Sequence, residues 1–479
     1  GFSSREYHKF STASLITRST NDVQQVQQVM AMMFRIVLYA PILGIGGVLK
    51  VLNTDSSMTW ILGVAVGLIL IVIFVLFQVA MPKFTILQTL IDRLNLVSRE
   101  ILTGIPVIRA FSREKHEEDR FEKANLDLTK TNLFVNRCMT FMMPIMMLIM
   151  NGVSVLIIYS GAHAVDNGTM QVGNVMAFIQ YAMQIIMSFL MITAMSIMLP
   201  RANVAALRID EVLKTEVSIQ DPETPVHPSE SVKGEIEFDH VSFAYPEAGE
   251  NVLTDISFKA KKGQTIAVIG STGSGKSTLI NLIPRYYDVT KGSVKVDGVD
   301  VRDMTQKELR DKLGYVPQKG VLFSGTIDSN IRYGKPEITD AQVKEAAEVA
   351  QATEFIDTKP EKYESPVSQG GTNVSGGQKQ RLSIARAIAK DPEIFIFDDS
   401  FSALDFKTDS QLRKALKEYT KDATTVIVAQ RISTILGADQ IIVLDDGHMA
   451  GIGTHKELMA NCEVYQQIAR SQLSEEELA

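Results

Sequence analysis

Residues 265–280 read TIAVIGSTGSGKSTLI, and this stretch sets the architecture of the second half of the chain. Residues 265–269 predict a buried strand, and the apolar residues 278–280 begin a helix. Between them, 270–277 fits the P-loop pattern G-x-x-x-x-G-K-[ST], whose glycines let the backbone curl so that its N–H groups face phosphate oxygens. The helix N-terminus adds a partial positive charge. The pattern predicts a nucleotide site in which Lys276 reaches the β- and γ-phosphates and Ser277 binds Mg²⁺.

Further strand-like segments in this half alternate with helical stretches. They lie at 234–243, 394–397, 425–428 and 440–444. This alternation indicates an α/β domain with a largely parallel sheet. The segment 394–397 ends in Asp398 and Asp399. A carboxylate at the end of such a strand can complete the Mg²⁺ shell, so Asp398 is a candidate magnesium ligand.

A second candidate phosphate cradle lies at 374–378, which reads VSGGQ and opens a helical run to residue 390. Serine and two glycines at a helix start can present N–H groups to an anion. The alternative is an ordinary helix cap in a surface turn, which is the favoured interpretation of this motif in isolation. Because a P-loop is already present, a second cradle would imply a second nucleotide, or one nucleotide shared between two copies.

The average composition combines two different halves. Of the 479 residues, 48 are Lys or Arg and 55 are Asp or Glu, and 18 of the 21 methionines lie within the first 200. The mild negative charge argues against a protein dedicated to nucleic-acid binding. Two cysteines, Cys138 and Cys462, are too few for a disulfide framework or a four-ligand zinc site.

The first 200 residues contain long stretches without charge. Residues 58–82, 138–165 and 167–200 carry no Asp, Glu, Lys or Arg, and 23–49 carries only Arg35. A membrane-spanning helix needs about 20 mostly apolar residues. The alternative is a set of buried helices in a soluble core, which rarely run so far without a charge. We therefore predict four spans, near 29–49, 58–82, 138–161 and 172–199.

Lysine and arginine set the orientation of these spans. The segment 83–137 holds ten of them, whereas 50–57 and 162–171 hold only Lys50 between them. Basic loops stay in the cytoplasm. The 83–137 loop, residues 1–28 and the whole sequence after the last span are therefore predicted to lie inside the cell.

The 83–137 loop is expected to form long helix extensions. In its centre, 104–111 reads GIPVIRAF, which breaks the helical pattern with a glycine and a proline and should dock onto something cytoplasmic. A plain turn between two helices is the alternative. Farther along, the Pro-containing segment 224–230 is typical of a linker. The predicted domains are a membrane domain (1–205), a linker (206–232) and a nucleotide-binding domain (233–475).

Together these motifs resemble those of ATP-binding-cassette (ABC) transporters. The resemblance rests on the P-loop, the signature at 374–378, Gln318 in YVPQ, Asp398, and the SALD sequence at 402–405. The order of the domains is similar to that of exporter half-transporters. It implies a multidomain fold, with an all-α transmembrane domain of the exporter type followed by an α/β P-loop ATP-binding cassette.

Family exporters have six spans in each half. The sequence FSTASLITRSTNDV at 10–23 is similar to the cytoplasmic stretch that leads into their third span. We therefore expect this sequence to be truncated at its N-terminus, without the first two spans. The resemblance also matches the polar residues 4–12 to the first coupling helix and 104–111 to the second, which docks on a cassette.

The resemblance implies that the chain binds ATP and Mg²⁺. It matches Tyr245 to the aromatic residue that stacks on adenine, and Gln318 to the glutamine that senses Mg²⁺. The expected metal ligands are Ser277, Gln318 and Asp398. The expected nucleotide-binding residues are Tyr245, Gly270, Ser271, Thr272, Gly273, Ser274, Gly275, Lys276, Ser277 and Thr278, with Ser375, Gly376, Gly377 and Gln378 of the signature.

The expected catalytic residues are Gln318, Asp399 and Gln430. The last two depart from the family pattern. Asp399 stands where a Glu usually orients the attacking water, and Gln430 stands where the switch residue is usually His. Asp is one methylene shorter, so its oxygen falls about 1.5 Å short, and errors of about 1 Å can cost ~10²-fold in rate. Gln offers an amide in place of an imidazole and cannot be protonated. Either change alone is compatible with neutral drift, but together they resemble the degenerate site of a heterodimeric exporter.

In such exporters, each ATP lies between the P-loop of one chain and the signature of the other. We therefore expect an ATP-hydrolysing exporter subunit in the cell membrane, with a cytoplasmic cassette and a second half-transporter as its partner. Its own P-loop site would be the slow one, so that hydrolysis occurs mainly at the partner's site. Methionine-rich spans with Gln180 and Gln184 suit hydrophobic or amphipathic cargo of the drug or lipid kind.

Three alternatives stay open at this point. The first is a homodimeric ABC exporter or lipid flippase that tolerates Asp399, which fast ATP turnover without a partner would favour. The second is a soluble ATPase of the DNA-repair or translation type, against which the four predicted spans argue. The third is a membrane regulator that binds ATP without transport, which the absence of substrate-stimulated activity with the partner would favour.

Overall fold

The computed structural model describes residues 1–479 except for 55–57, 230, 247 and 474–479. The chain divides into two compact units, one formed by Thr12–Thr215 and the other by Gly1–Ser11 together with Glu216–Ala479. The described residues of the first unit form only helices, whereas the second unit combines strands and helices. The structure confirms the predicted order of an all-α domain followed by an α/β domain.

Four long helices make up most of the first unit. They are α3 (Val23–Thr54), α4 (Thr59–Ala110), α5 (Glu114–Asp166) and α6 (Val172–Leu213), preceded by α2 (Thr12–Thr17) and the π-helix η1 (Arg18–Asp22). Four helical stretches in the described chain are long and apolar enough to cross a membrane: Thr12–Asn53, Thr59–Leu76, Glu114–Asp166 and Val172–Ile192. Each overlaps one of the four spans predicted from the sequence.

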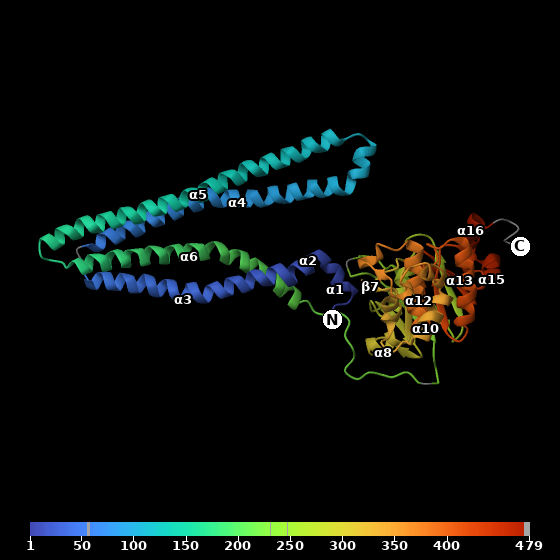
Figure 1. Ribbon diagram of the computed structural model, residues 1–479. Coiled ribbons are helices and arrows are strands. Elements are labelled where there is room, and N and C mark those ends of the chain that lie inside the picture. The colour runs from blue at the N-terminus through green and yellow to red at the C-terminus, as the bar shows by residue number, and fades with distance from the viewer. Residues whose placement is uncertain (55–57, 230, 247, 474–479) are drawn as a thin grey trace. The chain divides into compact units, whose positions relative to one another are not determined.

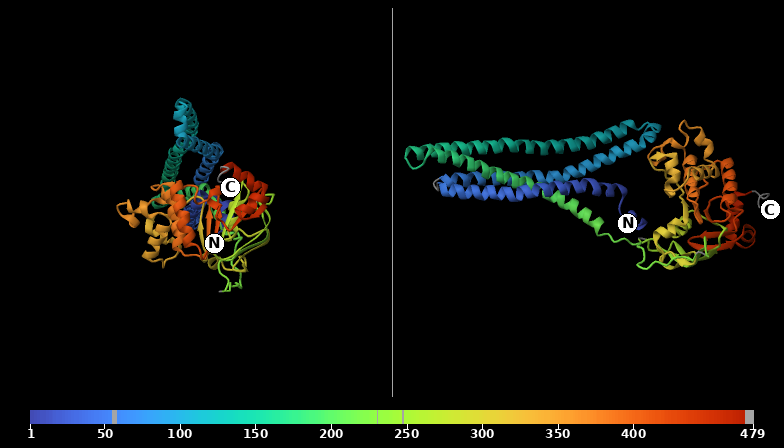
Figure 2. Two further views of the ribbon diagram at one scale, coloured as in Figure 1. Left: turned by 90° about the vertical axis from the view of Figure 1, so that its right-hand side faces the viewer. Right: turned by 60° about the horizontal axis from the view of Figure 1, so that its bottom comes forward.

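The long helices pair as α3 with α6 and α4 with α5, and the two pairs diverge toward the connection between α4 and α5 (Figure 1, Figure 2). Glycine brings α3 close to α6, because a Cβ added at Gly47 would lie 2.8 Å from Ile185 Cγ1. At the other end of the pairs, all four helices meet in one buried cluster. They contribute to it Val51, Ile61, Ile157 and Phe178.

The predicted break at 104–111 is wrong. Helix α4 continues through Gly104 and Pro106 to Ala110, and residues 111–113 connect it to α5. A proline removes one backbone hydrogen bond and kinks a helix, but it does not end the helix when the turns on both sides persist. Figure 1 shows α4 bending near this end.

Helix α6 extends past residue 205, where we expected the linker to begin. Ion pairs hold the extension against the preceding η1 segment: Arg208 Nη1 lies 3.4 Å from Asp22 Oδ2, and Arg18 Nη1 donates a 2.7 Å hydrogen bond to Glu211 Oε2. Because these charges have partners in the same unit, a charged segment that resembles a linker in sequence remains helical to Leu213.

A six-stranded sheet forms the centre of the second unit. Its strands lie in the order β12-β11-β3-β10-β9-β6, and all neighbours are parallel except β12 with β11. They are β3 (Thr265–Gly270), β6 (Leu313–Val316), β9 (Ile394–Asp398), β10 (Thr424–Val428), β11 (Gln440–Asp445) and β12 (His448–Gly453). The predicted strands at 265–269, 394–397, 425–428 and 440–444 all belong to it, which confirms the largely parallel sheet.

A second sheet in this unit is antiparallel, with the order β2-β1-β4-β5. Its strands are β1 (Ile236–Phe243), β2 (Leu253–Ala260), β4 (Lys291–Val296) and β5 (Val299–Asp300), and a separate small pair comprises β7 (Gly325–Thr326) and β8 (Pro366–Val367). The predicted strand at 234–243 corresponds to β1. The other strands were not predicted, because their short or half-buried sequences lack a continuous apolar run.

The helices of the second unit surround these sheets. They are α1 (Ser4–Lys9), α7 (Lys276–Leu282), α8 (Gln306–Asp311), α9 (Ile327–Ile331), α10 (Asp340–Val349), α11 (Thr353–Asp357), α12 (Gly376–Ala389), α13 (Phe406–Tyr419), α14 (Ile432–Ile435), α15 (His455–Asn461) and α16 (Glu463–Gln472), with the 3-10 turns η3 (Arg332–Gly334), η4 (Lys362–Glu364) and η5 (Gln369–Gly371).

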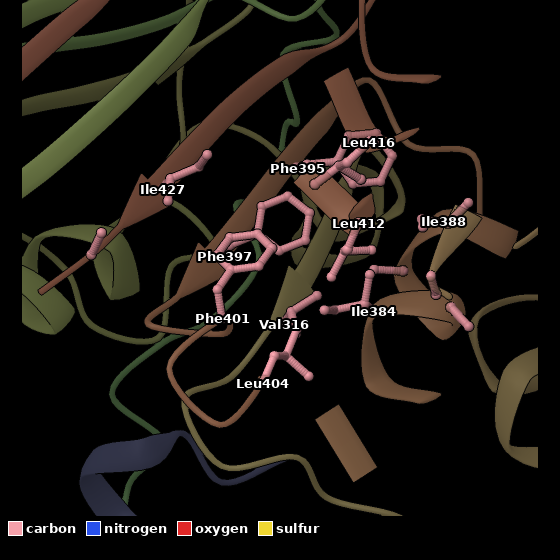
Figure 3. Close-up of a cluster of buried hydrophobic side chains, with 14 of the residues drawn as sticks. Val316, Ile384, Ile388, Phe395, Phe397, Phe401, Leu404, Leu412, Leu416 and Ile427 are labelled. Carbon is pink, nitrogen blue, oxygen red and sulfur yellow. The ribbon is translucent and has the colours of Figure 1, made fainter. Parts of the chain in front are cut away.

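The main core of this unit lies between the six-stranded sheet and helices α12 and α13. Phe395 and Phe397 of β9 stack with ring centroids 6.0 Å apart, beside Ile384 of α12 and Leu412 of α13 (Figure 3). Each such buried side chain contributes about 1.5–3 kcal/mol to folding. The core therefore fixes the end of β9 and the start of α12, where predicted site residues lie.

The first eleven residues, at the start of the predicted membrane domain, group with the α/β unit by their contacts. Glu6 of α1 accepts hydrogen bonds from Ser3 N at 2.7 Å and from Ser218 N at 3.2 Å. Burial alone would raise the pKa of Glu6, but the hydrogen bonds from Ser3 and Ser218 lower it to about 2. A six-residue helix is unstable by itself, so these contacts hold α1 in place.

Candidate nucleotide-binding site

The P-loop connects β3 to α7 at the carboxyl edge of the parallel sheet. The four central residues of β3 are buried between β10 and β11. Two of the loop glycines are required by geometry: a Cβ at Gly270 would lie 2.1 Å from Leu444 O, and Gly275 has a left-handed φ of +94°. Helix α7 begins at Lys276, and the N–H groups of its first turn have no partners within the helix.

The Lys276 ammonium lies over this loop. Its Nζ donates hydrogen bonds to Gly270 O at 2.9 Å and to Ser271 O at 2.6 Å. Burial lowers the pKa of Lys276, and the negative charges of Asp399 and Asp398 oppose that shift. The predicted phosphate-binding lysine is thus held by the loop that is predicted to surround the phosphates.

Two of the predicted metal ligands meet beside the lysine. Ser277 Oγ donates a 2.9 Å hydrogen bond to Asp398 Oδ1, which joins the start of α7 to the end of β9. Asp398 is buried, and this burial raises its pKa. Hydroxyl and carboxylate oxygens are ligands that Mg²⁺ prefers, so the pair fits the predicted ion.

Asp399, the next residue, accepts hydrogen bonds from two amide side chains through one oxygen. Gln430 Nε2 donates to Asp399 Oδ2 at 2.8 Å, and Gln318 Nε2 donates to the same atom at 3.3 Å. The backbone of Asp399 has a left-handed φ of +46°. Burial raises the pKa of Asp399, which hydrogen bonds from Gln318 and Ser402 partly offset. The structure therefore brings the three predicted catalytic residues together.

The predicted adenine-stacking residue lies against the P-loop helix. The Tyr245 hydroxyl is 3.0 Å from Thr278 Oγ1 in α7. Its ring meets those of Phe243 and Tyr287 edge-on, with centroids 4.9 and 5.2 Å away. Three aromatic rings therefore lie at the side of the predicted nucleotide site.

The signature forms a helix cap in this chain. Ser375 Oγ accepts a hydrogen bond from Gln378 N, and Gln378 Oε1 accepts one from Ser375 N at 3.1 Å, which is a capping box at the start of α12. A Cβ at Gly377 would lie 3.3 Å from Ala403 O, so the signature packs against the 402–405 loop. Among the described residues, the hydrogen bonds of Ser375 and Gln378 stay within this cap and do not reach the P-loop.

Two residues that were not predicted from the sequence tie the segment around Gln318 to α12. Gln380 Nε2 donates to Pro317 O at 3.1 Å, beside Gln318. Arg386 donates to Val321 O at 2.9 Å, and its guanidinium lies over the ring of Phe323. The position of Gln380 two residues after the signature was the available signal. No local pattern marked Arg386, whose partners lie far away in the sequence.

Comparison with known proteins places this geometry in a family. Residues 2–189 match the ABC transporter transmembrane region, and residues 253–402 match the ABC transporter family. An uncharacterized ABC transporter ATP-binding protein of Mycobacterium tuberculosis (strain ATCC 25618 / H37Rv) is 43% identical over 474 residues, which cover 98% of this chain and 81% of that protein.

Other relatives have names that describe export or transport. A putative multidrug export ATP-binding/permease protein of Bacillus subtilis (strain 168) is 36% identical, covering 95% of this chain and 78% of that protein. A fatty acid ABC transporter ATP-binding/permease protein of Mycobacterium bovis (strain ATCC BAA-935 / AF2122/97) is 32% identical, covering 95% and 72%.

A solved structure shares the arrangement of both domains. The structure of a bacterial Atm1-family ABC exporter with ATP bound matches with a TM-score of 0.78 at 25% identity, covering 99% of this chain and 83% of that one. The helical spans, the P-loop cassette and these matches agree, and the chain therefore belongs to the ABC transporter family, as a transmembrane exporter with a cytoplasmic ATP-binding cassette.

Proposed function

We propose that this chain is one half of a heterodimeric ATP-driven exporter, and that its own P-loop site hydrolyses ATP slowly. In this arrangement two cassettes close head to tail. This chain's P-loop, Asp399 and Gln430 form the slow site with the signature of the partner, and its own signature completes the site on the partner's P-loop. Most hydrolysis then occurs at the partner's site.

The observation that carries the proposal is that Asp399 is already hydrogen-bonded to two side chains. Its Oδ2 already accepts hydrogen bonds from the amides of Gln430 and Gln318. A general base must lie within about 2.6–3.2 Å of the group whose proton it takes, and Asp is a methylene shorter than Glu. Gln430 can neither donate nor accept a proton as an imidazole does. These features support a site that binds nucleotide better than it cleaves it.

The P-loop residues fit ATP and Mg²⁺. Lys276 would bind the β- and γ-phosphates, Ser277, Asp398 and Gln318 would hold the ion, and Tyr245 would stack on the adenine. Mg²⁺ neutralises negative charge on the phosphate oxygens. Hydroxyl, carboxylate and amide oxygens suit that ion, which supports the assignment.

The exposed apolar end of α4 would transmit cassette closure to the spans. Leu102, Val107 and Phe111 expose 70%, 60% and 74% of their surface. Apolar side chains so far from the charge-free segment of α4 favour a protein partner over lipid. The family resemblance of 104–111 to a coupling helix supports docking on a cassette of the dimer.

Hydrophobic or amphipathic molecules, such as drugs or lipids, are the proposed cargo. The relatives named for multidrug export and for fatty acids support this class. In α6, Gln184 is half-buried and the neighbouring Met187 is exposed. A polar group at membrane depth favours a partner or a wet cavity, and methionine adapts to cargo of varied shape.

ATP turnover by the full-length chain in detergent tests the proposal, alone and with a second half-transporter that has Glu and His at the positions matching Asp399 and Gln430. We expect slow turnover alone and at least tenfold faster turnover by the pair. Asp399→Glu combined with Gln430→His should raise turnover further, by up to roughly 10²-fold at this chain's site. The longer Glu side chain can reach the attacking water, and the His imidazole can take up and release a proton.

Asp445→Glu is the matched control, because Asp445 also ends a strand of the same sheet and is exposed. It should leave turnover unchanged. If the lone wild-type chain turns over several ATP molecules per second, the slow site is wrong and a homodimeric exporter or lipid flippase is the better description.

A further inference from the structure

We propose that Gln472, at the C-terminal end of α16, is a positioning residue that holds the switch residue Gln430 in place. Its side-chain amide makes two hydrogen bonds to the backbone on either side of Arg431. Nε2 donates to Gln430 O at 2.8 Å, and Oε1 accepts from Ile432 N at 2.9 Å. The inference rests on the proposed role of Gln430 and names a residue that controls it.

The backbone that Gln472 binds lies between two short elements. Strand β10 ends at Val428, and α14 begins at Ile432. The N-cap residue of α14, Arg431, makes no capping hydrogen bond with its side chain. Serine, threonine or aspartate usually supplies that acceptor from within the chain segment. Here Gln472, from another helix, accepts from Ile432 N, the first N–H of α14, and the same amide also satisfies the carbonyl of Gln430.

The position of this backbone sets the contact with Asp399. Gln430 Nε2 is 2.8 Å from Asp399 Oδ2. A hydrogen bond weakens once donor and acceptor lie more than about 3.2 Å apart, so a backbone shift of a few tenths of an ångström at Gln430 would change it. Gln472 opposes such a shift because it binds both sides of the turn.

Helix α16 is itself rigidly placed. Tyr465 and Ala469 are fully buried, and the Tyr465 hydroxyl lies 2.8 Å from His455 Nδ1. Arg413 Nη1 of α13 donates to Ser433 O at 2.9 Å. The switch segment, defined as residues 429–433, is therefore hydrogen-bonded to both α13 and α16, and a movement of α16 would reach the ATP site through Gln472.

Hydrogen exchange of the switch segment, measured on the full-length chain in detergent, tests the contact directly. Gln472→Ala should speed exchange of the Ile432 amide roughly fivefold, the factor expected for the loss of one hydrogen bond. Gln472→Glu keeps the acceptor and should keep that amide protected. Gln467→Ala is the matched control, because Gln467 lies on the same helix and its Nε2 donates to Glu463, so exchange of the switch segment should not change.

A double-mutant comparison tests whether the contact acts through Gln430. Hydrolysis by the paired transporter is measured with protein in excess of Mg-ATP, so that the slow site contributes. Because the Gln430 amide occupies Asp399 in the slow site, Gln472→Ala should raise the single-turnover rate constant at least threefold, with the half-saturating protein concentration unchanged within about twofold. It should have no further effect in a Gln430→Ala background. Gln467→Ala should change neither constant.

The outcomes separate this inference from the proposed function. If Gln472→Ala leaves exchange of the switch segment at the wild-type rate, the proposal that Gln472 holds this segment is wrong, whatever the rate of ATP turnover. If exchange rises but the two substitutions are additive in hydrolysis, Gln472 is structural only and the positioning role is wrong. If instead the lone wild-type chain hydrolyses ATP rapidly, the proposal of a slow site is wrong. The comparison of hydrogen exchange still tests the contact made by Gln472.

Discussion

Gln430 Nε2 donates a 2.8 Å hydrogen bond to Asp399 Oδ2 across the carboxyl ends of the neighbouring parallel strands β10 and β9. Gln318 reaches the same oxygen from beyond the end of β6, the next strand along. Parallel strands bring residues far apart in the chain to one edge of the sheet. One carboxylate oxygen of a predicted catalytic residue is thus shared by two amides.

Substitution of the P-loop lysine should abolish tight nucleotide binding. Lys276→Ala removes the ammonium that lies over Gly270 and Ser271. Charge-assisted hydrogen bonds contribute about 1.5–3 kcal/mol, so the affinity for Mg-ATP should fall roughly 10- to 100-fold, measured by equilibrium binding of a fluorescent ATP analogue. Lys262→Ala, at an exposed lysine before β3, should bind normally, and an equal loss in both variants would contradict the assignment.

Neutralising Asp399 should stabilise the cassette. Asp399→Asn removes a buried charge, keeps an acceptor for Gln430 and suits the left-handed backbone. We expect a rise of about 2–4 °C in apparent Tm, equivalent to roughly 1 kcal/mol. Asp446→Asn is the control, since Asp446 has a similar φ of +45° but is exposed. If Asp446→Asn is equally stabilising, the backbone conformation and not the buried charge is the cause.

The same buried charge predicts a pH dependence. Burial raises the pKa of Asp399 in the folded chain, so the folded state binds the proton more tightly than the unfolded state. The stability of the wild type therefore increases as pH falls through that raised pKa. The difference in apparent Tm between Asp399→Asn and wild type should shrink as pH is lowered from neutral. A difference that grows would contradict the burial of a charged carboxylate.

The signature serine should act on the partner's site and not on this chain's own. Ser375→Ala removes the capping box at α12, which costs about 1 kcal/mol, and should lower ATP turnover of the pair at least tenfold. Affinity at this chain's own P-loop should be unchanged. Thr339→Ala removes a similar Thr-Gln capping box at α10 and should cost similar stability while sparing turnover. Equal turnover in both variants would refute the role.

Helix α1 should lose protection from hydrogen exchange when Glu6 is neutralised. Glu6→Gln weakens the hydrogen bonds from Ser3 and Ser218, and exchange of the amides in α1 should speed up roughly tenfold. Glu216→Gln, at an exposed site nearby, should have no effect.

Low pH should mimic Glu6→Gln. The pKa of Glu6 is lowered from 4.5 to about 2, so its stabilising effect is complete above pH 4.5 and is lost as pH falls toward 2. Protection of α1, corrected for the intrinsic exchange rate, should decline over that window in the wild type and stay flat in Glu6→Gln. A parallel decline in both would show that another group is responsible.

Arg386 should be irreplaceable by lysine. Its guanidinium donates to Asn330 O, Asn330 Oδ1 and Val321 O with planar geometry, which an ammonium cannot reproduce. Arg386→Lys should destabilise the cassette by about 2 kcal/mol, read as a lower apparent Tm. Arg470→Lys, at an exposed position on α16, should leave Tm unchanged.

Much of the fold was predictable because its signals are local. The charge-free stretches identify membrane helices by length alone, and the P-loop is encoded in eight consecutive residues. The errors were also local. At Pro106 the pattern predicted a break, but the helix bends and continues. The predicted linker included Arg208 and Glu211, but their partners Asp22 and Arg18 lie on a segment that sequence inspection does not pair with α6.

The sequence specified the P-loop, the strand before it and the spans, because each depends on residues that are neighbours in the chain. The tertiary structure decided which side chains contact one another. Two amides donate to Asp399, Ser375 and Gln378 cap α12, and Gln472 binds the backbone of the switch segment. Those contacts depend on the strand order β12-β11-β3-β10-β9-β6 and on the packing of α16. Strand order arises from the packing of the whole domain, so no local spacing encodes it.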